Sequence, residues 1–396
     1  MLETLKQLPD DPILGLMAAY RSDKNPLKID LGVGIYKDEA GNTPVLEAVK
    51  QAQRFHNDNE TTKAYIGPPG APGFGRLMET LVLGEGHSAL VSGRTNTLQT
   101  PGGCGALRTA AELIKRCNAG ATVWVSNPTW ANHIPLMGDA GLKIQEYPYY
   151  DRASSSILFD DMMAALEQVG PQDVVLVHGC CHNPCGADLN LEQWQQLAEL
   201  AKARGFLPLV DIAYQGLGDG LDQDATGLRL LADAVPELLI TASCSKNFGL
   251  YRERTGAIIA ISKTTVARDV THSQLCNVVR GNYSMPPAHG AALVEIILES
   301  DELTALWNDE LTVMRNRINE LRQLLVEKIV AKGIERDFSF ITRQKGMFSF
   351  LGISPEQVGQ LKANNSIYLV DSSRVNIAGV NSNNIDYLVD SLAAVL

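Results

Sequence analysis

Short apolar runs alternate with longer stretches of helical periodicity between about residues 95 and 262. Runs of three to five apolar residues are typical of strands that are buried on both faces of a sheet. Their alternation with helical stretches such as 191–204 predicts an α/β fold, with a mainly parallel central sheet covered by helices. The runs lie at 123–125, 174–177, 206–210, 238–241 and 257–261.

Helical periodicity is strongest toward the C-terminus. Apolar residues recur at steps of three and four from Leu303 to Ile329, which predicts one long helix. A shorter helix is predicted at 46–55, and strand-like runs follow the long helix at 338–341, 347–351 and 367–370. These elements predict a smaller α/β domain in addition to the large one.

Composition narrows the class of protein. The chain has 396 residues, of which 45% are hydrophobic and 20% charged, values typical of a soluble globular protein with room for two domains. It has no apolar run near the roughly 20 residues of a membrane span, and residues 1–12 lack the apolar segment of a secretory signal. We therefore expect a cytoplasmic protein that does not bind membranes. The net charge of -11 also disfavours a nucleic-acid partner.

Seven cysteines are scattered along the chain, an odd number that favours reduced thiols over a disulfide framework. Three of them gather with two histidines in the segment His178–Cys185, and these residue types can ligate zinc. Because the segment follows directly on a predicted strand, alternate side chains should point to opposite faces and not converge on one ion. We expect no metal. A zinc-binding structural protein is kept as the alternative from a different class.

Ligands of parallel α/β sheets bind at the carboxyl ends of the strands, so the residues just after each apolar run are candidates. In addition, the stretch Gly102-Gly103-Cys104-Gly105 opens a predicted helix and presents free backbone N–H groups to an anion. Its spacing is not the Gly-x-Gly-x-x-Gly dinucleotide fingerprint, which disfavours a nicotinamide enzyme. The strand-end candidates are Trp130, His133, Asn183, Asp211, Tyr214 and Lys246.

Lys246 is the most informative of these candidates. A lysine shielded at a strand end loses its proton readily and can form a Schiff base with an aldehyde. The hydroxyls of Ser243 and Ser245 and the guanidinium of Arg254 are suited to a phosphate monoester. Lysine, hydroxyls and arginine together predict pyridoxal 5′-phosphate as the cofactor.

The other strand-end residues suit the ring of the same cofactor. Asp211 can keep a pyridine nitrogen protonated, which makes the ring an electron sink. Tyr214 and Asn183 can donate hydrogen bonds to the phenolate oxygen of the ring, and Trp130 can stack on its face.

Six segments, in unbroken order from about Asp11 to the C-terminus, resemble class I aminotransferases and most closely their aspartate and aromatic branch. The resemblance implies a fold-type I homodimer with active sites shared between subunits. It also implies a large domain at 44–313 and a small domain built from 1–43 and 314–396. The segments are Asn127–His133, His182–Asp188, Asp211–Gly216, Ser243–Gly256, Arg280–Ser284 and Ser373–Gly379.

The resemblance also implies residue roles. Lys246 would hold the cofactor and then move the proton between the substrate α-carbon and the cofactor. Arg374 would bind the substrate α-carboxylate, and Arg280 of the second subunit would bind the distal carboxylate of a dicarboxylic substrate. Gly34, Trp130 and Asn183 would line the substrate site. The phosphate would be held by Gly103, Cys104, Ser243, Ser245 and Arg254, with Tyr65 from the second subunit.

The implied reaction is amino transfer from aspartate to 2-oxoglutarate in a ping-pong cycle, with aromatic amino acids as further donors. The alternative is an aromatic-amino-acid aminotransferase with aspartate as a minor substrate, and a β-lyase or decarboxylase is a third reading on the same fold. Cys104 and Cys185 replace the usual serine or threonine of the family. Met285 and Ala64 replace asparagines of the aspartate branch, which loosens the expected preference for aspartate, whereas Lys37 and Thr43 match that branch.

Overall fold

The computed structural model describes residues 1–8 and 12–396, so Asp11, where the resemblance begins, lies outside the described residues. The chain divides into two compact units. The large unit comprises Pro44–Asn316 and Gln344–Gly346, and the small unit comprises Met1–Thr43, Arg317–Arg343 and Met347–Leu396. The domain boundaries inferred from the resemblance stay a prediction.

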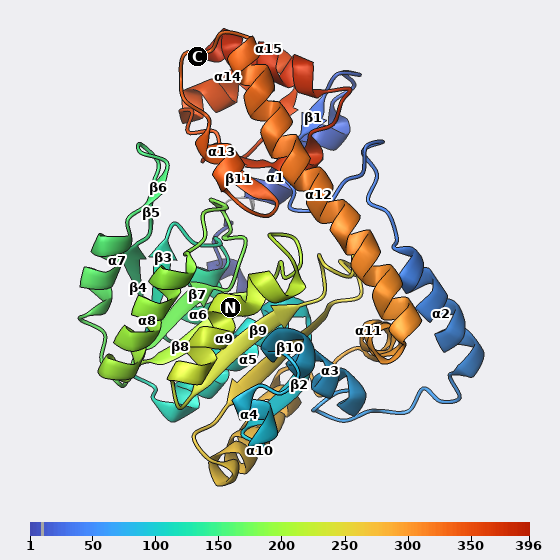
Figure 1. Cartoon of the computed structure of the whole chain (residues 1–396), viewed down its shortest axis with the longest axis vertical. Helices are drawn as coiled ribbons and strands as arrows, with labels where there is room; N and C mark the ends of the chain where they lie inside the picture. The colour runs from blue at the N-terminus through green and yellow to red at the C-terminus, as the bar shows by residue number, and fades with distance from the viewer. Residues whose placement is uncertain (9–11) are drawn as a thin grey trace. The chain divides into compact units, whose positions relative to one another are not determined.

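A seven-stranded sheet forms the centre of the large unit, in the order β2-β10-β9-β8-β7-β3-β4 (Figure 1). Strand β10 is antiparallel to both of its neighbours, and the remaining pairs are parallel. The predicted α/β fold with a mainly parallel sheet is therefore confirmed. The strands are β2 (Thr95–Pro101), β3 (Thr122–Asn127), β4 (Lys143–Pro148), β7 (Val174–His178), β8 (Leu207–Ile212), β9 (Leu238–Ser243) and β10 (Thr255–Ile261).

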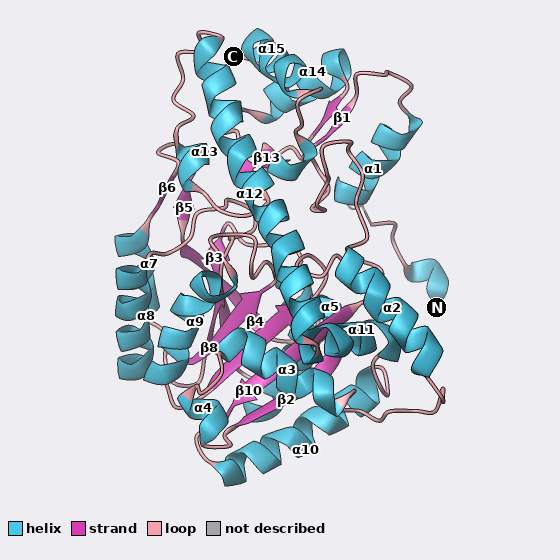
Figure 2. Cartoon of the chain, turned by 45° about the vertical axis from the view of Figure 1, so that its right-hand side comes forward, coloured by secondary structure: helices cyan, strands magenta, loops and turns pink. Residues whose placement is uncertain are grey.

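Both faces of this sheet are covered by helices, as Figure 2 shows by the helices around the magenta strands. In β7, Val174 and Leu176 belong to the core cluster that contains α5, while Val175 and Val177 lie on the other side with Leu197 of α8. Both faces of one strand are thus apolar, which explains its uninterrupted apolar run. The helices of the large unit are α2 (Glu47–Asn59), α3 (Pro72–Leu83), α4 (Ser88–Val91), α5 (Gly102–Cys117), α6 (His133–Gly138), α7 (Phe159–Leu166), α8 (Leu191–Arg204), α9 (Leu221–Ala234), α10 (Thr265–Asn282) and α11 (Ala288–Glu299).

The ends of α8 show how the sequence sets such boundaries. Asn190 accepts from the backbone N–H of Gln193, and the Gln193 side chain accepts in return from the backbone of Asn190, forming a capping box. Gly205 ends the helix in the left-handed conformation at φ 74°. The helix therefore begins and ends where the periodicity of 191–204 predicts.

The small unit is built from both ends of the chain and from the second half of α12 (Asp301–Ala331). Strand β1 (Ile29–Asp30) pairs in parallel with β12 (Ile367–Tyr368), and β11 (Phe348–Phe350) pairs antiparallel with β13 (Arg374–Asn376). The other helices of the unit are α1 (Pro12–Ser22), α13 (Phe340–Arg343), α14 (Pro355–Asn365) and α15 (Ile385–Val395), with 3₁₀ turns at Leu2–Thr4 and Ile377–Gly379. A short hairpin, β5 (Tyr150–Asp151) with β6 (Ser156–Ile157), completes the strands of the large unit.

Residues 338–341, predicted to be strand-like, do not form a strand, so this prediction is wrong. Asp337 accepts from the backbone N–H of Ser339 at 2.7 Å, and this turn leads into the helix α13 at Phe340. An aspartate that bonds the backbone two residues on favours a turn over an extended strand.

Strands β2 and β4 were absent from the predicted runs because their side chains are mostly polar or exposed. Strand β4 lies at one edge of the sheet, and β2 buries polar residues such as Gln99. In the described part of the chain, no helix combines the length and apolarity needed to cross a membrane.

Candidate active site

Lys246 lies three residues beyond the end of β9, at the carboxyl edge of the parallel strands. Its Nζ atom is 4.7 Å from the centroid of the Tyr214 ring. Burial lowers the pKa of the Lys246 ammonium; Asp211 and Cys104 act to raise it, and Arg254 adds to the lowering. The amine therefore loses its proton at lower pH than an exposed lysine, as a nucleophile or base requires.

Asp211 lies near the end of β8 with 8% of its surface exposed. Its Oδ1 accepts from the Thr241 hydroxyl at 2.8 Å, and its Oδ2 accepts from His133 Nε2 at 3.3 Å. Burial acts to raise the pKa of Asp211, but the hydrogen bonds from His133 and Thr241 and the nearby imidazoles of His133 and His178 together lower it. Asp211 is thus an ionised carboxylate at neutral pH despite its burial.

A chain of hydrogen bonds extends from Asp211 through two histidines. Thr129 Oγ1 lies 2.8 Å from His133 Nδ1 and 3.2 Å from His178 Nε2. Burial lowers the pKa of His178 to about 3, so this imidazole is neutral. Because the Asp211 carboxylate only accepts, His133 donates to it from Nε2. The single Thr129 hydroxyl then meets both rings, and it can donate to one ring nitrogen while accepting from the other.

We expect Thr129→Val to destabilise the protein by about 1–3 kcal/mol, because two buried imidazole nitrogens would lose their partner. Thr129→Ser keeps the hydroxyl and is the matched control. The thermal unfolding midpoints of the cofactor-free variants measure the difference, which excludes stabilisation by a bound ligand. A valine variant as stable as the serine variant would contradict the role given to the hydroxyl.

An anion cradle forms where α5 begins beside β9 and β10. A Cβ atom at Gly102 would lie 2.6 Å from Arg254 Nη2, so the guanidinium packs directly on the first turn of the helix. Arg254 donates to Ser245 Oγ at 3.4 Å, and Ser243 Oγ donates to the same oxygen at 3.1 Å. Gly103 faces Ser243, where a Cβ would lie 3.4 Å from the serine Cβ. Free helix N–H groups, two hydroxyls and one guanidinium therefore surround one position, as a phosphate requires.

Three further predicted residues lie in the same unit, two after strand ends and one in the first turn of α5. Trp130 follows β3 and packs edge-to-face on His133, with ring centroids 5.2 Å apart. Asn183 is buried in the loop after β7, and Cys104 is half-buried in the first turn of α5, with its sulfur 3.9 Å from the Asn132 amide. The carboxyl edge of the sheet thus brings together all the predicted cofactor residues of the large unit except Tyr65.

Four predicted residues lie apart from this group. Tyr65 is 92% exposed, and Arg280 is exposed on the last turn of α10, where it donates to Ser284 Oγ. Gly34 and Arg374 belong to the small unit.

Within the small unit, Gly34 and Arg374 share one aromatic neighbour. Arg374 opens β13, is 6% exposed and donates from Nη2 to the Gly32 carbonyl at 2.7 Å. Its guanidinium carbon lies 4.3 Å from the centroid of Phe348, and a Cβ at Gly34 would lie 2.6 Å from Cζ of that ring. The cation is thus held by this packing and by its bond to the backbone, and a side chain at position 34 would collide with the Phe348 ring unless the ring moved.

The outer residues Thr129, His178 and Thr241 are absent from the sequence-based site. Thr241 contacts Asp211 because β8 and β9 pair with these two residues in register, which the apolar runs do not reveal. The strand-end rule had selected His133 without giving it a partner. Its contact with Asp211 depends on the placement of α6.

The surroundings of the clustered cysteines disfavour zinc binding. Among the described residues, the group with suitable spacing is Cys180, Cys181 and Asp224, whose ligand atoms lie within 4.8 Å of one another. The Asp224 carboxylate, however, accepts three backbone N–H groups at 2.7–2.9 Å. A hydrogen bond to Cys181, followed by burial, raises the pKa of Cys180 well above its usual value, which disfavours a thiolate ligand.

The sequence and the structure of this chain are both similar to those of known aminotransferases. The chain matches the family model described as aminotransferase class I and II over residues 26–392. It is 48% identical to the aspartate aminotransferase of Escherichia coli (strain K12) over 396 residues, which is 100% of both chains. It is 45% identical to the aromatic-amino-acid aminotransferase of Pseudomonas aeruginosa over 389 residues, or 98% of this chain and 97% of that one. The solved aromatic-amino-acid aminotransferase from Burkholderia pseudomallei, covalently bound to pyridoxal phosphate, superimposes with a TM-score of 0.98 and 42% identity over 100% of this chain and 99% of that one.

Proposed function

The chain belongs to the aminotransferase class I and II family, and we propose that it transfers the amino group of aspartate to 2-oxoglutarate and accepts aromatic amino acids as further donors. The observation that carries this proposal is the shielded amine of Lys246 over Tyr214. An aminotransferase of this kind depends on pyridoxal 5′-phosphate.

The residues at the sheet edge fit this cofactor. The cradle at Gly102 offers donors to a phosphate, Asp211 is a buried carboxylate suited to a protonated ring nitrogen, and Lys246 offers the amine. When bound, pyridoxal phosphate supplies an aldehyde that takes up the amino group and a ring that withdraws electrons from the substrate α-carbon.

Each residue then has a defined task. Lys246 Nζ would take the proton from the substrate α-carbon and move it between that carbon and the cofactor. Asp211 keeps the proton on the ring nitrogen, and its bonds to His133 and Thr241 hold the carboxylate in place. Tyr214 and Asn183 would donate to the ring oxygen, and Trp130 would offer its face to the ring. The phosphate is bound by Gly103, Cys104, Ser243, Ser245 and Arg254, with the Cys104 contact made by its backbone N–H because a thiol is a weak donor.

Substrate recognition involves the small unit and a second copy of the chain. Arg374 binds the α-carboxylate through two hydrogen bonds, with Gly34 in the same part of the site. Tyr65 and Arg280 of a second copy contact the phosphate and the distal carboxylate, which makes the protein a homodimer with shared sites. Their exposure within one chain supports this role. We also place the protein in the cytoplasm, supported by seven cysteines without a disulfide.

The test is an assay of the purified protein with pyridoxal phosphate, aspartate and 2-oxoglutarate, in which oxaloacetate and glutamate should form in equal amounts. With aspartate alone the reaction should stop after one equivalent per site. Continuous turnover without a keto acid would instead indicate a lyase or decarboxylase. No transfer to 2-oxoglutarate from aspartate, tyrosine or phenylalanine would overturn the proposal.

The alternative is an aromatic-amino-acid aminotransferase with aspartate as its minor substrate. Met285 and Ala64 favour it, because both replace polar asparagines of the aspartate branch with apolar groups. Comparing kcat/KM for aspartate, tyrosine and phenylalanine decides between the two.

We expect Arg280→Ala to lower kcat/KM for aspartate by about 10- to 150-fold, the loss of one charge-assisted hydrogen bond. The value for phenylalanine should change little, because that substrate has no distal carboxylate. Arg116→Ala is the matched control, since Arg116 is an exposed arginine that bonds Gln274 and Asn277 of α10. Equal losses for both substrates would contradict the assignment.

A further inference from the structure

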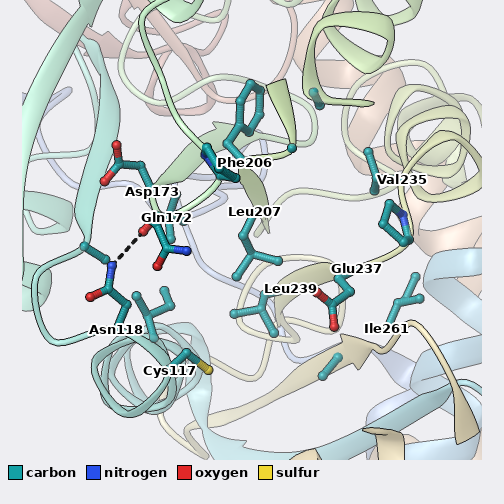
Figure 3. A pocket seen from close by; sticks show the side chains of 18 of the residues that line it. Cys117, Asn118, Gln172, Asp173, Phe206, Leu207, Val235, Glu237, Leu239 and Ile261 are labelled. Carbon is teal, nitrogen blue, oxygen red and sulfur yellow. Dashed lines mark hydrogen bonds between the residues drawn. The ribbon is translucent and has the colours of Figure 1, made fainter. Parts of the chain in front are cut away.

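A cavity of about 290 Å³ opens in the large unit at the amino ends of the parallel strands (Figure 3). It is lined by Val174 and Leu207, the first residues of β7 and β8, and by Leu239 of β9. Asp211 lies four residues further along β8, a distance of about 13 Å at the usual rise of a strand. The cavity is therefore separate from the proposed cofactor site.

The floor of the cavity is continuous with the hydrophobic core. Leu113, Ile114, Val174 and Leu239 line it and also belong to the core cluster between the sheet and α5. A ligand that enters would exchange water for aliphatic contacts on several sides, which favours an apolar body. The volume is at the lower limit of small-molecule pockets, so that body is limited to about one six-membered ring with a short arm.

One wall carries an acidic group that is available to a ligand. Figure 3 shows the Glu237 carboxylate directed into the cavity between Leu239 and Ile261. Glu237 is exposed, and no hydrogen bond or ion pair joins its side chain to another described residue. The polar side chains of the opposite wall already have hydrogen-bond partners within the protein. Asn118 donates to the Gln172 carbonyl at 3.1 Å, and Asp173 accepts from the Thr122 N–H at 2.9 Å.

We propose that this cavity binds a small organic cation, whose apolar ring lies on Leu207 and Leu239 and whose ammonium group pairs with Glu237. Lys202 also lines the cavity, so binding of a carboxylate is the competing outcome that an experiment has to distinguish.

Cys117 provides a reporter for occupancy. It lines the cavity and is the one exposed residue among the seven cysteines, while Cys104 and Cys276 are intermediate and the other four are buried. Burial, and then the charge of Glu237, raise the pKa of the Cys117 thiol, so a cation paired with Glu237 lies near the reacting sulfur. A bound ligand should slow alkylation of Cys117 because it covers the sulfur from the reagent.

The experiment uses the holoenzyme and N,N-dimethylbenzylamine, a tertiary amine that cannot form a Schiff base with the cofactor. Phenylacetate and benzyl methyl ether are the anionic and neutral analogues. The rate of Cys117 alkylation by iodoacetamide is followed by peptide mass spectrometry, with Cys276 in the same digest as the reference. We expect half-maximal protection by the amine at a concentration on the order of a millimolar, and at about two- to fivefold lower concentration than by either analogue.

Two variants test the pairing. In Glu237→Gln the advantage of the amine should disappear, and unprotected Cys117 should react faster because the neighbouring charge is gone. In the control Lys202→Gln the amine should protect as in the parent protein. The proposal is overturned if all three compounds protect equally, if phenylacetate protects best, if the amine keeps its advantage in Glu237→Gln, or if no compound protects Cys117.

Discussion

Replacing Lys246 by alanine is expected to lower the rate of amino transfer by about four orders of magnitude or more, because one substitution removes both the nucleophilic amine and the base. The rate of the half-reaction with aspartate, measured in a single turnover on protein shown to retain pyridoxal phosphate, isolates this step from cofactor loss. Lys263→Ala is the matched control, since Lys263 is exposed just after β10.

A small primary amine should restore part of the lost activity in Lys246→Ala, because it can enter the space left by the side chain and accept the proton. We expect methylamine to rescue the variant in proportion to the concentration of its neutral form. Unimpaired transfer in the variant without added amine would refute the role of Lys246. A lack of rescue together with normal cofactor binding would argue that the lysine contributes mainly as the nucleophile.

The second large effect is expected at Arg374. Replacing it with alanine removes two charge-assisted hydrogen bonds to the α-carboxylate, worth about 1.5–3 kcal/mol each, so kcat/KM should fall by about 10²- to 10⁴-fold. Arg374→Lys keeps the charge but not the planar fork, and should recover only a minor part of the loss. Steady-state assays with aspartate and phenylalanine measure the effect.

Because every amino acid has an α-carboxylate, both donors should be impaired to a similar degree in Arg374→Ala. This pattern separates Arg374 from Arg280, whose loss should affect aspartate selectively. Arg343→Ala serves as the control in the same unit, since Arg343 is exposed and bonds only to Ser339 among the described residues. An Arg374→Ala enzyme impaired with aspartate alone would show that the two arginines had been assigned in reverse.

The sequence predicted the sheet well because its central strands are buried on both faces and leave uninterrupted apolar runs. Strand β2 was not predicted because several of its buried residues are polar and leave no apolar run. Gln99, for instance, is buried and donates a hydrogen bond to the Pro287 carbonyl at 2.7 Å. A polar strand of this kind is recognisable only when its partners are known.

The same reason limits prediction of the site. Strand ends and the family resemblance select Lys246 and Asp211 from the sequence, and the comparisons support the cofactor and the reaction class. The supports of Asp211 cannot be predicted in this way. Thr241 reaches it through strand register, and His133 reaches it through the placement of a separate helix. The individual roles of these site residues stay predictions.

Cys185, which replaces the serine or threonine usual in the family, lies in a buried hydrogen-bonded group. Its sulfur lies 3.2 Å from His182 Nδ1, and His182 Nε2 lies 3.1 Å from Ser126 Oγ. Burial raises the pKa of the Cys185 thiol, and burial lowers the pKa of His182. Both groups are therefore neutral, and the thiol lies within hydrogen-bond distance of the imidazole at a position where the family usually has a hydroxyl.

The bridging hydroxyl of Thr129 limits how this chain can be redesigned. Among the described residues it is the group that hydrogen-bonds both His133 Nδ1 and His178 Nε2, and to do so it donates to one ring while accepting from the other. Of the twenty standard amino acids, only serine and threonine place a hydroxyl at that reach. A library that randomises the residues around the cofactor should therefore hold position 129 to these two, because other side chains would leave the support of Asp211 broken before substrate preference could be selected.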